Sequence, residues 1–283
     1  MGTCVGRGLQ QLHHQVKFYD ISAERVHELH RIGLTATSSL DESLEDCEIS
    51  IVCVPTPTIG GRIDLSSLQS LVRGLASCLR RRAGYHLVVI KSTVVPTTTE
   101  TLVIPILEQQ SGRKVGSEVG VCVNPEFMTE IHGSWTDDQS FARGFFDEPA
   151  IVIGESDKTS GDRLAEVYRP LRRPIIRTSL VTSEMIKYAF NCALATKISY
   201  WNEIHYVCRL LNVDSETVAR VAGMDPRIGT YGTVHGKAFG GKCLPKDLRA
   251  LIQFVTDLGY DPKLLKAVEE VNKRIGADKG VRE

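Results

Sequence analysis

The hydrophobic pattern of this chain changes character partway along its length. Up to about residue 179, short continuous apolar runs alternate with stretches of helical periodicity, and the later residues show helical periodicity alone. Apolar runs without polar alternation are typical of parallel strands that helices cover on both faces. We therefore expect an α/β domain over residues 1–178 and an all-helical domain over 179–283. The expected strands are 15–19, 48–54, 86–91, 120–124, 150–153 and 174–177.

The expected helices follow from apolar residues spaced three and four positions apart. Residues 154–159 are rich in turn formers and are expected to form a loop in the first domain. The second domain opens with one long helical pattern, residues 183–211, that contains neither Gly nor Pro. The remaining expected helices are 22–32, 65–79, 161–168, 213–221, 248–258 and 263–275.

Composition narrows the class of protein. The chain has 283 residues with 34 basic and 34 acidic side chains, so no net field favours nucleic acid or an anionic membrane. Its eight cysteines form no C-x-x-C pair, so we expect no zinc or other metal site. Cys53 and Cys122 lie inside apolar runs, as structural thiols in a reducing compartment do. No apolar run approaches the ~20 residues that span a bilayer, and we expect a cytoplasmic protein.

A dinucleotide site is indicated at the start of the chain. Asp20 ends the first expected strand, where an acid holds the adenosine ribose in such sheets. Gly2 followed by a helical stretch resembles the last glycine of a G-x-G-x-x-G turn and its helix. We therefore expect a Rossmann-like sheet whose first strand and leading glycines would precede Met1. Gly6 and Gly8 lie inside that helical stretch, so we do not expect them to bind phosphate.

Two later strand ends carry small hydroxyl residues. P-T-P-T occupies residues 55–58, and S-T-V-V-P occupies residues 92–96. Ligands bind outside the carboxyl ends of parallel strands, so these hydroxyls are candidates to contact a cofactor or substrate. The alternative is that Pro and Thr only end the strands. The candidates for cofactor binding are Thr56, Thr58, Ser92 and Thr93.

Cys243 lies in the sequence F-G-G-K-C-L-P-K-D, residues 239–247. The glycines allow close approach of the backbone to a ligand, and Pro245 fits the first position of a helix. The positive end of that helix, with Lys242 and Lys246, favours the thiolate over the thiol. The alternative is a buried structural cysteine, which the flanking residues make less favourable.

Other candidate groups recur at helical spacing. Lys187 and Asn191 are four residues apart and share one helix face, and Cys243 and Asp247 repeat that spacing. Two carboxylates four residues apart, Glu126 and Glu130, follow an expected strand. An arginine, Arg227, lies in the turn at residues 223–229.

Taken together, these motifs resemble the UDP-glucose/GDP-mannose 6-dehydrogenase family. The matching segments, in the family's order, are P-T-P-T at 55–58, S-T-V-V-P at 92–96, N-P-E-F at 124–127, M-I-K-Y-x-x-N at 185–191, M-D-P-R-I-G at 224–229 and F-G-G-K-C-L-P-K-D at 239–247. Phe127 favours the glucose and mannose branch over the N-acetylhexosamine branch. The M-D-P-R-I-G turn looks more like the UDP-glucose enzymes, with GDP-mannose as the alternative substrate.

The resemblance implies an NAD-dependent four-electron oxidation of a nucleotide sugar through a thiohemiacetal and a thioester on Cys243. It implies hydrogen-bond donors at Lys187 and Asn191, and groups that handle water and protons at Asp247, Glu126 and Thr93. It also implies a homodimer through the helical domain, with Arg227 reaching the other subunit's substrate. Cofactor contacts are implied for Gly2, Asp20, Thr56, Thr58, Ser92, Thr93 and Lys246. Substrate contacts are implied for Phe127, Met128, Glu130, Lys187, Arg227, Phe239 and Gly240.

The chain also departs from the family pattern. The first strand and leading glycines are expected to be missing, as is the family's second nucleotide-binding domain after the helix at 263–275. Lys242 stands where the family carries a small residue. The chain could therefore be part of an active dehydrogenase or a non-catalytic paralogue that serves as a dimerisation module. A third alternative is an unrelated NAD(P)-dependent 3-hydroxyacid reductase, which would also need a lysine-asparagine pair. That alternative does not explain the segment F-G-G-K-C-L-P-K-D. Retention of every chemical residue favours the first reading.

Overall fold

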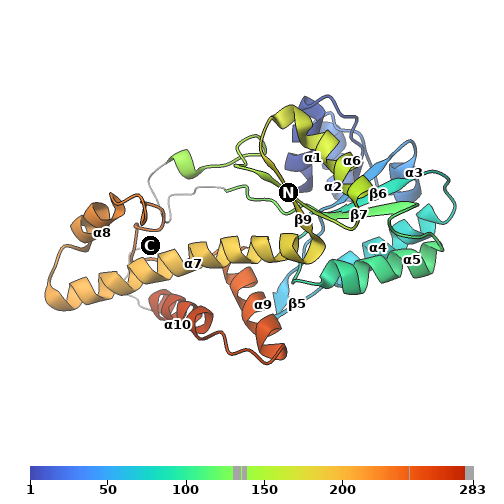
Figure 1. Cartoon of the computed structure of the whole chain (residues 1–283). Coiled ribbons are helices and arrows are strands. Elements are labelled where there is room, and N and C mark those ends of the chain that lie inside the picture. Colours follow the sequence, from blue (N-terminus) through green and yellow to red (C-terminus); the bar gives the residue numbers. More distant parts are fainter. Residues whose placement is uncertain (130–134, 136–138, 242, 278–283) are drawn as a thin grey trace. The chain divides into compact units, whose positions relative to one another are not determined.

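A computed structural model describes residues 1–129, 135, 139–241 and 243–277. It forms two compact units, and each is made of segments that are discontinuous in sequence (Figure 1). The first unit comprises Met1–Thr56, Asp64–Phe127 and Phe145–Met185. The second comprises Pro57–Ile63, Met128–Gly144 and Ile186–Glu283. No single cut near residue 179 therefore separates them, although the long helix begins there.

The first unit contains a five-stranded sheet in the order β3-β6-β7-β8-β9. All neighbours in this sheet are parallel except β7 and β8, which are antiparallel. The expectation of parallel strands is wrong at this one pair. Parallel neighbours need a crossover helix, and the described residues between β7 and β8 contain only a short 3-10 turn, Gln139–Phe141. The strands are β3 Ile49–Val52, β6 His86–Ile90, β7 Val119–Val123, β8 Ile151–Glu155 and β9 Ile175–Ser179.

A separate parallel pair, β1 Phe18–Tyr19 and β2 Ala36–Thr37, follows the first helix of the chain. Helix α1, Gly2–Gln11, contains Gly6 and Gly8, as the sequence indicated. A Cβ atom on Gly6 would lie 2.4 Å from the Phe18 ring, and one on Gly8 would lie 2.2 Å from the Phe145 ring. These two glycines therefore permit close packing of aromatic rings.

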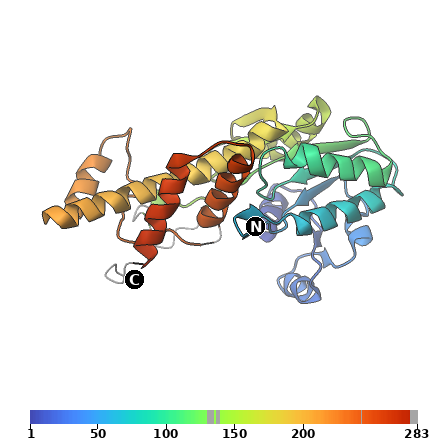
Figure 2. The same ribbon diagram turned by 90° about the horizontal axis from the view of Figure 1, so that it is seen from below.

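Helices pack against the five-stranded sheet. Helix α4, Ser66–Leu79, and helix α5, Ile104–Ser111, lie side by side in both views (Figures 1 and 2). Their buried leucines and valines join those of β6 and β7 in one core, which includes Leu68, Leu79, Leu107, Val88 and Val121. The short helix α3, Leu40–Leu44, the π turn Thr99–Val103 and α5 were not expected from the sequence. Helix α2, Ala23–Arg31, was expected.

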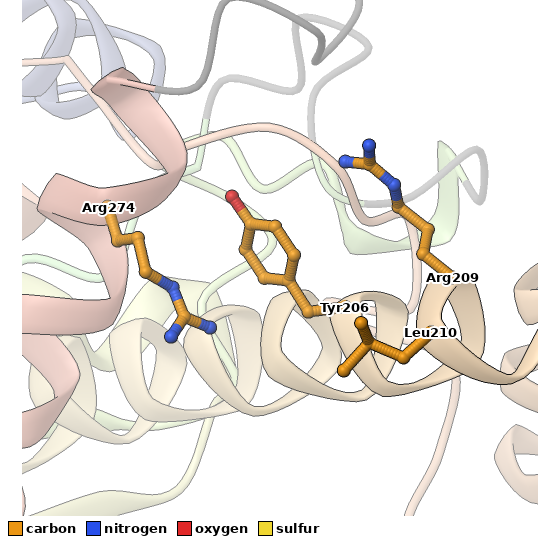
Figure 3. Close-up of a pocket in the computed structure, with 4 residues that line it drawn as sticks. All are labelled: Tyr206, Arg209, Leu210 and Arg274. Atoms are coloured by element: carbon orange, nitrogen blue, oxygen red, sulfur yellow. The ribbon is translucent and has the colours of Figure 1, made fainter.

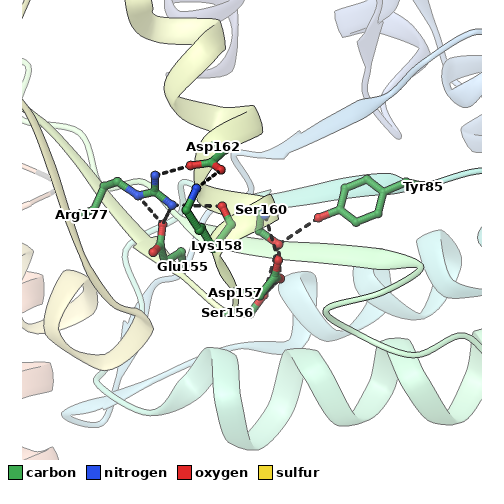
Figure 4. Close-up of polar contacts among 8 residues, drawn as sticks. All are labelled: Tyr85, Glu155, Ser156, Asp157, Lys158, Ser160, Asp162 and Arg177. Carbon is green, nitrogen blue, oxygen red and sulfur yellow. Dashed lines mark hydrogen bonds and ion pairs between the residues drawn. The ribbon is translucent and has the colours of Figure 1, made fainter.

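A polar network fixes the start of helix α6, Lys158–Tyr168 (Figure 4). The Asp157 side chain accepts from the backbone N–H of Ser160 at 3.0 Å and caps the helix. The Tyr85 hydroxyl lies 3.0 Å from the Ser160 hydroxyl. Arg177 of β9 pairs with Glu155 of β8 and reaches Asp162. The loop expected at 154–159 is therefore shorter than its sequence suggested.

The second unit is mainly helical (Figure 2). It contains α7, Leu180–Leu211, from Ile186 onward, with α8 Ser215–Gly223, α9 Leu244–Asp257 and α10 Lys263–Ala277. Ser199 of α7 donates a 3.0 Å hydrogen bond to the Val268 carbonyl of α10. An unexpected hairpin, β4 Thr58–Ile59 and β5 Arg62–Ile63, packs on α9, where Arg62 pairs with Asp257. None of the helices in the described ranges is both long and apolar enough to cross a membrane.

Candidate active site

Cys243 occupies the N-cap position of helix α9 and is exposed. Its carbonyl accepts the backbone N–H of Asp247 at 2.9 Å, the first hydrogen bond of the helix. Pro245 lies at the second helical position and not at the first as expected, and a missing N–H costs little at either position because both belong to the unpaired first turn. Leu248 and Leu251 on the buried face of α9 hold the helix in the unit. The thiol thus sits beside a helix N-terminus, as expected, while Lys242 lies outside the described residues.

Three predicted groups are buried on α7 and on the first turn of α9. Lys187 and Asn191 lie on α7, and Asp247 lies in the first turn of α9 with only 1% of its surface exposed. The Asn191 amide donates to Asp247 Oδ2 at 2.6 Å. Lys246 forms an ion pair with the other oxygen, Oδ1. The structure therefore joins the Lys187–Asn191 face to the cysteine helix through a hydrogen-bonded carboxylate.

Two asparagines that the sequence did not single out hold the loop before Cys243. Asn202 of α7 accepts from the Gly236 N–H at 2.7 Å and donates to the Lys237 carbonyl at 2.9 Å. Asn272 of α10 accepts from the Phe239 N–H at 2.8 Å and donates to the Phe239 carbonyl at 3.0 Å. Phe239 is buried and Gly240 is exposed. Four backbone groups are thereby satisfied, so this loop has a defined path toward the cysteine.

The hairpin contributes a further contact to the same helix. The Thr58 hydroxyl donates to the Lys246 carbonyl at 3.0 Å. Because Lys246 is in the first turn of α9, this bond ties the hairpin to the segment that carries Cys243. Thr58, expected near a cofactor, therefore has a structural contact within the second unit.

Three other cysteines differ chemically from Cys243, namely the buried Cys122 and Cys192 and the partly buried Cys53. Burial, with a smaller contribution from the Asp247 carboxylate, raises the pKa of the Cys192 thiol to about 12. Burial also raises the pKa of Cys53 and of Cys122. Such thiols stay protonated and unreactive at neutral pH. The exposed position of Cys243 makes it the better candidate nucleophile.

The other predicted catalytic residues belong to the first unit. Glu126 and Phe127 follow β7 and are buried. The Thr56 hydroxyl donates to the Thr93 carbonyl at 2.6 Å, and the Ser92 hydroxyl donates to the Val54 carbonyl at 2.7 Å. These bonds join the ends of β3 and β6. The hydroxyls of Thr56 and Ser92 thus have backbone partners in this structure.

The predicted cofactor groups at the start of the chain suit a dinucleotide. Gly2 opens α1, whose first turn has no side-chain cap, so its N–H groups can donate hydrogen bonds to a phosphate. A Cβ on Gly2 would meet only Cys53, at an ordinary 3.5 Å. Asp20 accepts the Ser22 N–H at 2.9 Å through Oδ1, and a carboxylate retains capacity for ribose hydroxyls. These residues fit the adenosine end of NAD.

Arg227 lies on the surface of the second unit and pairs with Asp225 at 2.7 Å. It borders a hollow of about 330 Å³. The other lining residues of that hollow are Thr196, Lys197, Tyr200, Trp201 and Ile228. Met128 also belongs to this unit, and Glu130 lies outside the described residues.

A larger hollow, of about 460 Å³, contains none of the predicted residues (Figure 3). Tyr206, Arg209 and Leu210 of α7 line it with Arg274 of α10. The Arg274 guanidinium stacks 4.4 Å from the Tyr206 ring centre. Both arginines lie in the last turn of their helices, where cations complement the helix dipole.

Comparison with known proteins covers most of the chain. Residues 14–172 match the NAD binding domain of the UDP-glucose/GDP-mannose dehydrogenase family, and residues 181–274 match its central domain. UDP-glucose 6-dehydrogenase AglM of Haloferax volcanii is 36% identical over 96% of this chain. GDP-mannose 6-dehydrogenase of Azotobacter vinelandii is 41% identical over 77% of it.

The structural comparison agrees. A UDP-glucose dehydrogenase from Pyrobaculum islandicum superposes with a TM-score of 0.87 at 31% identity, covering 96% of this chain and 66% of that one. The chain spans 67% of the length of the Haloferax protein and 49% of the Azotobacter protein. With two family domains matched across its length, the chain belongs to the UDP-glucose/GDP-mannose dehydrogenase family of nucleotide-sugar dehydrogenases.

Proposed function

We propose that this chain carries the catalytic residues of an NAD-dependent oxidation that converts the C6 alcohol of a nucleotide sugar to a carboxylate. The observation that carries the proposal is the arrangement in the second unit. An exposed cysteine occupies the N-cap position of α9, and a buried carboxylate one turn later is hydrogen-bonded to the α7 face that bears Lys187 and Asn191. Nucleophile, donors and acid-base groups are thereby available within one unit.

The proposed chemistry has two oxidations and one hydrolysis. Bound NAD⁺ would accept one hydride in each oxidation. After the first oxidation, the Cys243 thiolate attacks the C6 aldehyde and forms a thiohemiacetal. Loss of a hydride from that carbon leaves a thioester. Water then breaks the C–S bond, so that the sugar acid leaves and the thiol is restored.

The side-chain roles follow from donor and acceptor chemistry. Lys187 and Asn191 donate hydrogen bonds to the alkoxide and to the tetrahedral oxyanions. Asp247, held by Asn191, accepts and returns protons, and Glu126 with Thr93 orients the attacking water. Phe127, Met128 and Glu130 are assigned to the sugar nucleotide, as are Phe239 and Gly240 of the loop before the cysteine.

A second copy of the chain is the proposed partner. Leu210, Leu211 and Met224, at the end of α7 and beside α8, are each at least two thirds exposed. Such apolar side chains favour an interface between copies. Arg227 is exposed and lies three residues after Met224 in the sequence. It would reach the substrate of the other subunit.

UDP-glucose is the proposed substrate and GDP-mannose the alternative. The M-D-P-R-I-G turn favours UDP-glucose, while relatives named for either sugar match the chain at similar identity. NADH formation with each sugar distinguishes the two.

The test measures NADH and sugar acid formed by the wild-type chain, by Cys243→Ala and by Cys4→Ala, a matched variant of the other exposed cysteine. We expect about two NADH per acid, loss of acid formation in Cys243→Ala and wild-type rates in Cys4→Ala. Wild-type acid formation by Cys243→Ala would exclude the thioester route. A folded wild-type chain that turns over neither sugar would count against the proposed function.

A further inference from the structure

Lys91 is a buried cation at the end of β6, and the proposed chemistry does not use it. Only 3% of its surface is exposed. Its Nζ donates to Asn124 Oδ1 at 2.8 Å and reaches the Asn124 carbonyl oxygen at 3.3 Å. Asn124 is the first residue after β7 and the first residue of N-P-E-F. The lysine therefore holds the residue from which the Glu126 segment begins.

Every polar group of Asn124 has a partner in the first unit. The Tyr168 hydroxyl donates to Asn124 Oδ1 at 2.7 Å, beside the bond from Lys91. The Asn124 amide donates to the Val152 carbonyl at 2.8 Å. The Asn124 backbone N–H donates to the Ile90 carbonyl at 2.9 Å. Because the side chain is bonded from three directions, its orientation is determined.

The far end of the same segment is anchored by Glu148, a carboxylate that also interacts electrostatically with Lys91. The Phe127 backbone N–H donates to Glu148 Oε1 at 3.1 Å. Glu148 and Glu126 are both more than nine-tenths buried. Glu126 thus lies between two anchored residues, Asn124 on Lys91 and Phe127 on Glu148.

The charges explain why a lysine is tolerated here. Burial disfavours the cation, but Tyr168, Glu148 and Glu126 oppose this effect, and the pKa of Lys91 is raised above its usual value. Lys91 is therefore charged at neutral pH, and two buried carboxylates, Glu148 and Glu126, interact with it electrostatically. A methionine would fill a similar volume without the cost of burying a charge. The cation therefore has a consequence beyond packing, namely the placement of the Asn124–Phe127 segment.

We propose that Lys91 is a positioning residue, which acts through Asn124 to fix the orientation of the Glu126 carboxylate and thereby supports thioester hydrolysis. This proposal rests on the proposed function, because that function assigns Glu126 to the attacking water. Lys91 itself need not touch the substrate.

The first experiment does not depend on turnover. Backbone hydrogen exchange is measured for Asn124, Glu126 and Phe127 and for β6 in the wild type, Lys91→Met, Lys91→Gln and Tyr168→Phe. Lys91→Gln keeps a donor for Asn124 but removes the charge, and Tyr168→Phe removes the other donor. Ile90→Val, at the neighbouring buried position of β6, is the matched control.

We expect exchange at Phe127 to accelerate at least tenfold in Lys91→Met, with β6 unchanged, and to stay at the wild-type rate in Ile90→Val. Lys91→Gln and Tyr168→Phe should give smaller accelerations. Wild-type exchange at Phe127 in a folded Lys91→Met protein would overturn the proposal, whether or not the chain is active. If Lys91→Met does not fold, the same comparison is decided by Lys91→Gln and Tyr168→Phe.

The second experiment follows the reaction before steady state. If Lys91 acts only on hydrolysis, Lys91→Met should still form two NADH per site rapidly, because both oxidations precede hydrolysis. Its steady-state turnover should then be at least tenfold slower than that of the wild type. A merely structural role would reduce the rapid phase and the slow phase together. Turnover by wild type with an unchanged slow phase in Lys91→Met would overturn the positioning role and leave the proposed function intact. Absence of turnover in wild type would count against the proposed function alone.

Discussion

A buried histidine makes the stability of the first unit depend on pH. His86 opens β6 and has only 3% of its surface exposed. Its Nδ1 lies 3.2 Å from the Cys47 carbonyl, and its Nε2 lies 2.8 Å from the Ser50 hydroxyl. The geometry assigns the proton to Nδ1, which donates to the carbonyl, so that Nε2 accepts from Ser50. Burial, and then the nearby Arg82, lower the pKa of His86 from 6.5 to about 4.

The size of the effect follows from linkage. An unfolded chain binds a proton at His86 below a pH of about 6.5, while the folded chain does so only below about 4. Unfolding therefore takes up a proton in this window, and stability is lost as the pH falls through it. The two pKa values give a loss of about 2 kcal/mol at a pH of about 5, and a limit of about 3 kcal/mol below both values.

The assay is urea unfolding followed by far-ultraviolet circular dichroism at pH values of about 7.5 and about 5. His86→Gln removes the titrating group, and His27→Gln, on the exposed face of α2, is the matched control. We expect the wild type and His27→Gln to lose about 2 kcal/mol more than His86→Gln between the two conditions. The same pH dependence in His86→Gln and wild type would refute the assignment of a neutral buried imidazole.

Three further predictions concern the thiols, the loop before the cysteine and the packing of α1. A thiol reagent at neutral pH should label Cys243 and Cys4 first and Cys192 only on unfolding, because burial raises the pKa of Cys192 to about 12. Rapid labelling of Cys192, followed by mass spectrometry, would contradict this prediction. Asn272→Ala leaves two backbone groups of Phe239 without their partner, so it should cost about 1–3 kcal/mol in urea unfolding and speed hydrogen exchange at Phe239, and unchanged exchange would argue against it. Gly8→Ala should lower stability by about 1–3 kcal/mol in thermal unfolding, because its methyl group would overlap the Phe145 ring. Gly276→Ala should not, because its methyl group would lie at an ordinary 3.6 Å from Ala238. Equal melting temperatures for Gly8→Ala and wild type would show that the ring moves aside without cost.

The periodic elements were predictable from the sequence because their pattern is local. Long amphipathic stretches gave α4, α7 and α10 close to their observed bounds, and continuous apolar runs gave β6 and β7. The β4–β5 hairpin has only two residues in each strand, so it presents no measurable alternation. The antiparallel pairing of β7 and β8 was also missed, because strand direction depends on the path of the connection.

The chemistry of the candidate site was also largely local. Helical spacing placed Lys187 and Asn191 on one face, and the residues around Cys243 indicated a helix N-terminus beside the thiol. Residue types and their spacing carry this information without knowledge of any distant contact. The sequence therefore determined which groups are present and which of them share an element.

Only the tertiary structure decided which polar side chains are buried and with what partners. Asp247 meets Asn191 from 56 residues away, Asn272 meets Phe239 across 33 residues, and Lys91 meets Asn124 across 33. A buried polar group must be hydrogen-bonded, but many donors in the chain could satisfy it equally well. Packing of the helices and strands selects the partner, and so it turned Lys91, Asn202 and Asn272 from unremarked residues into supports of the candidate site.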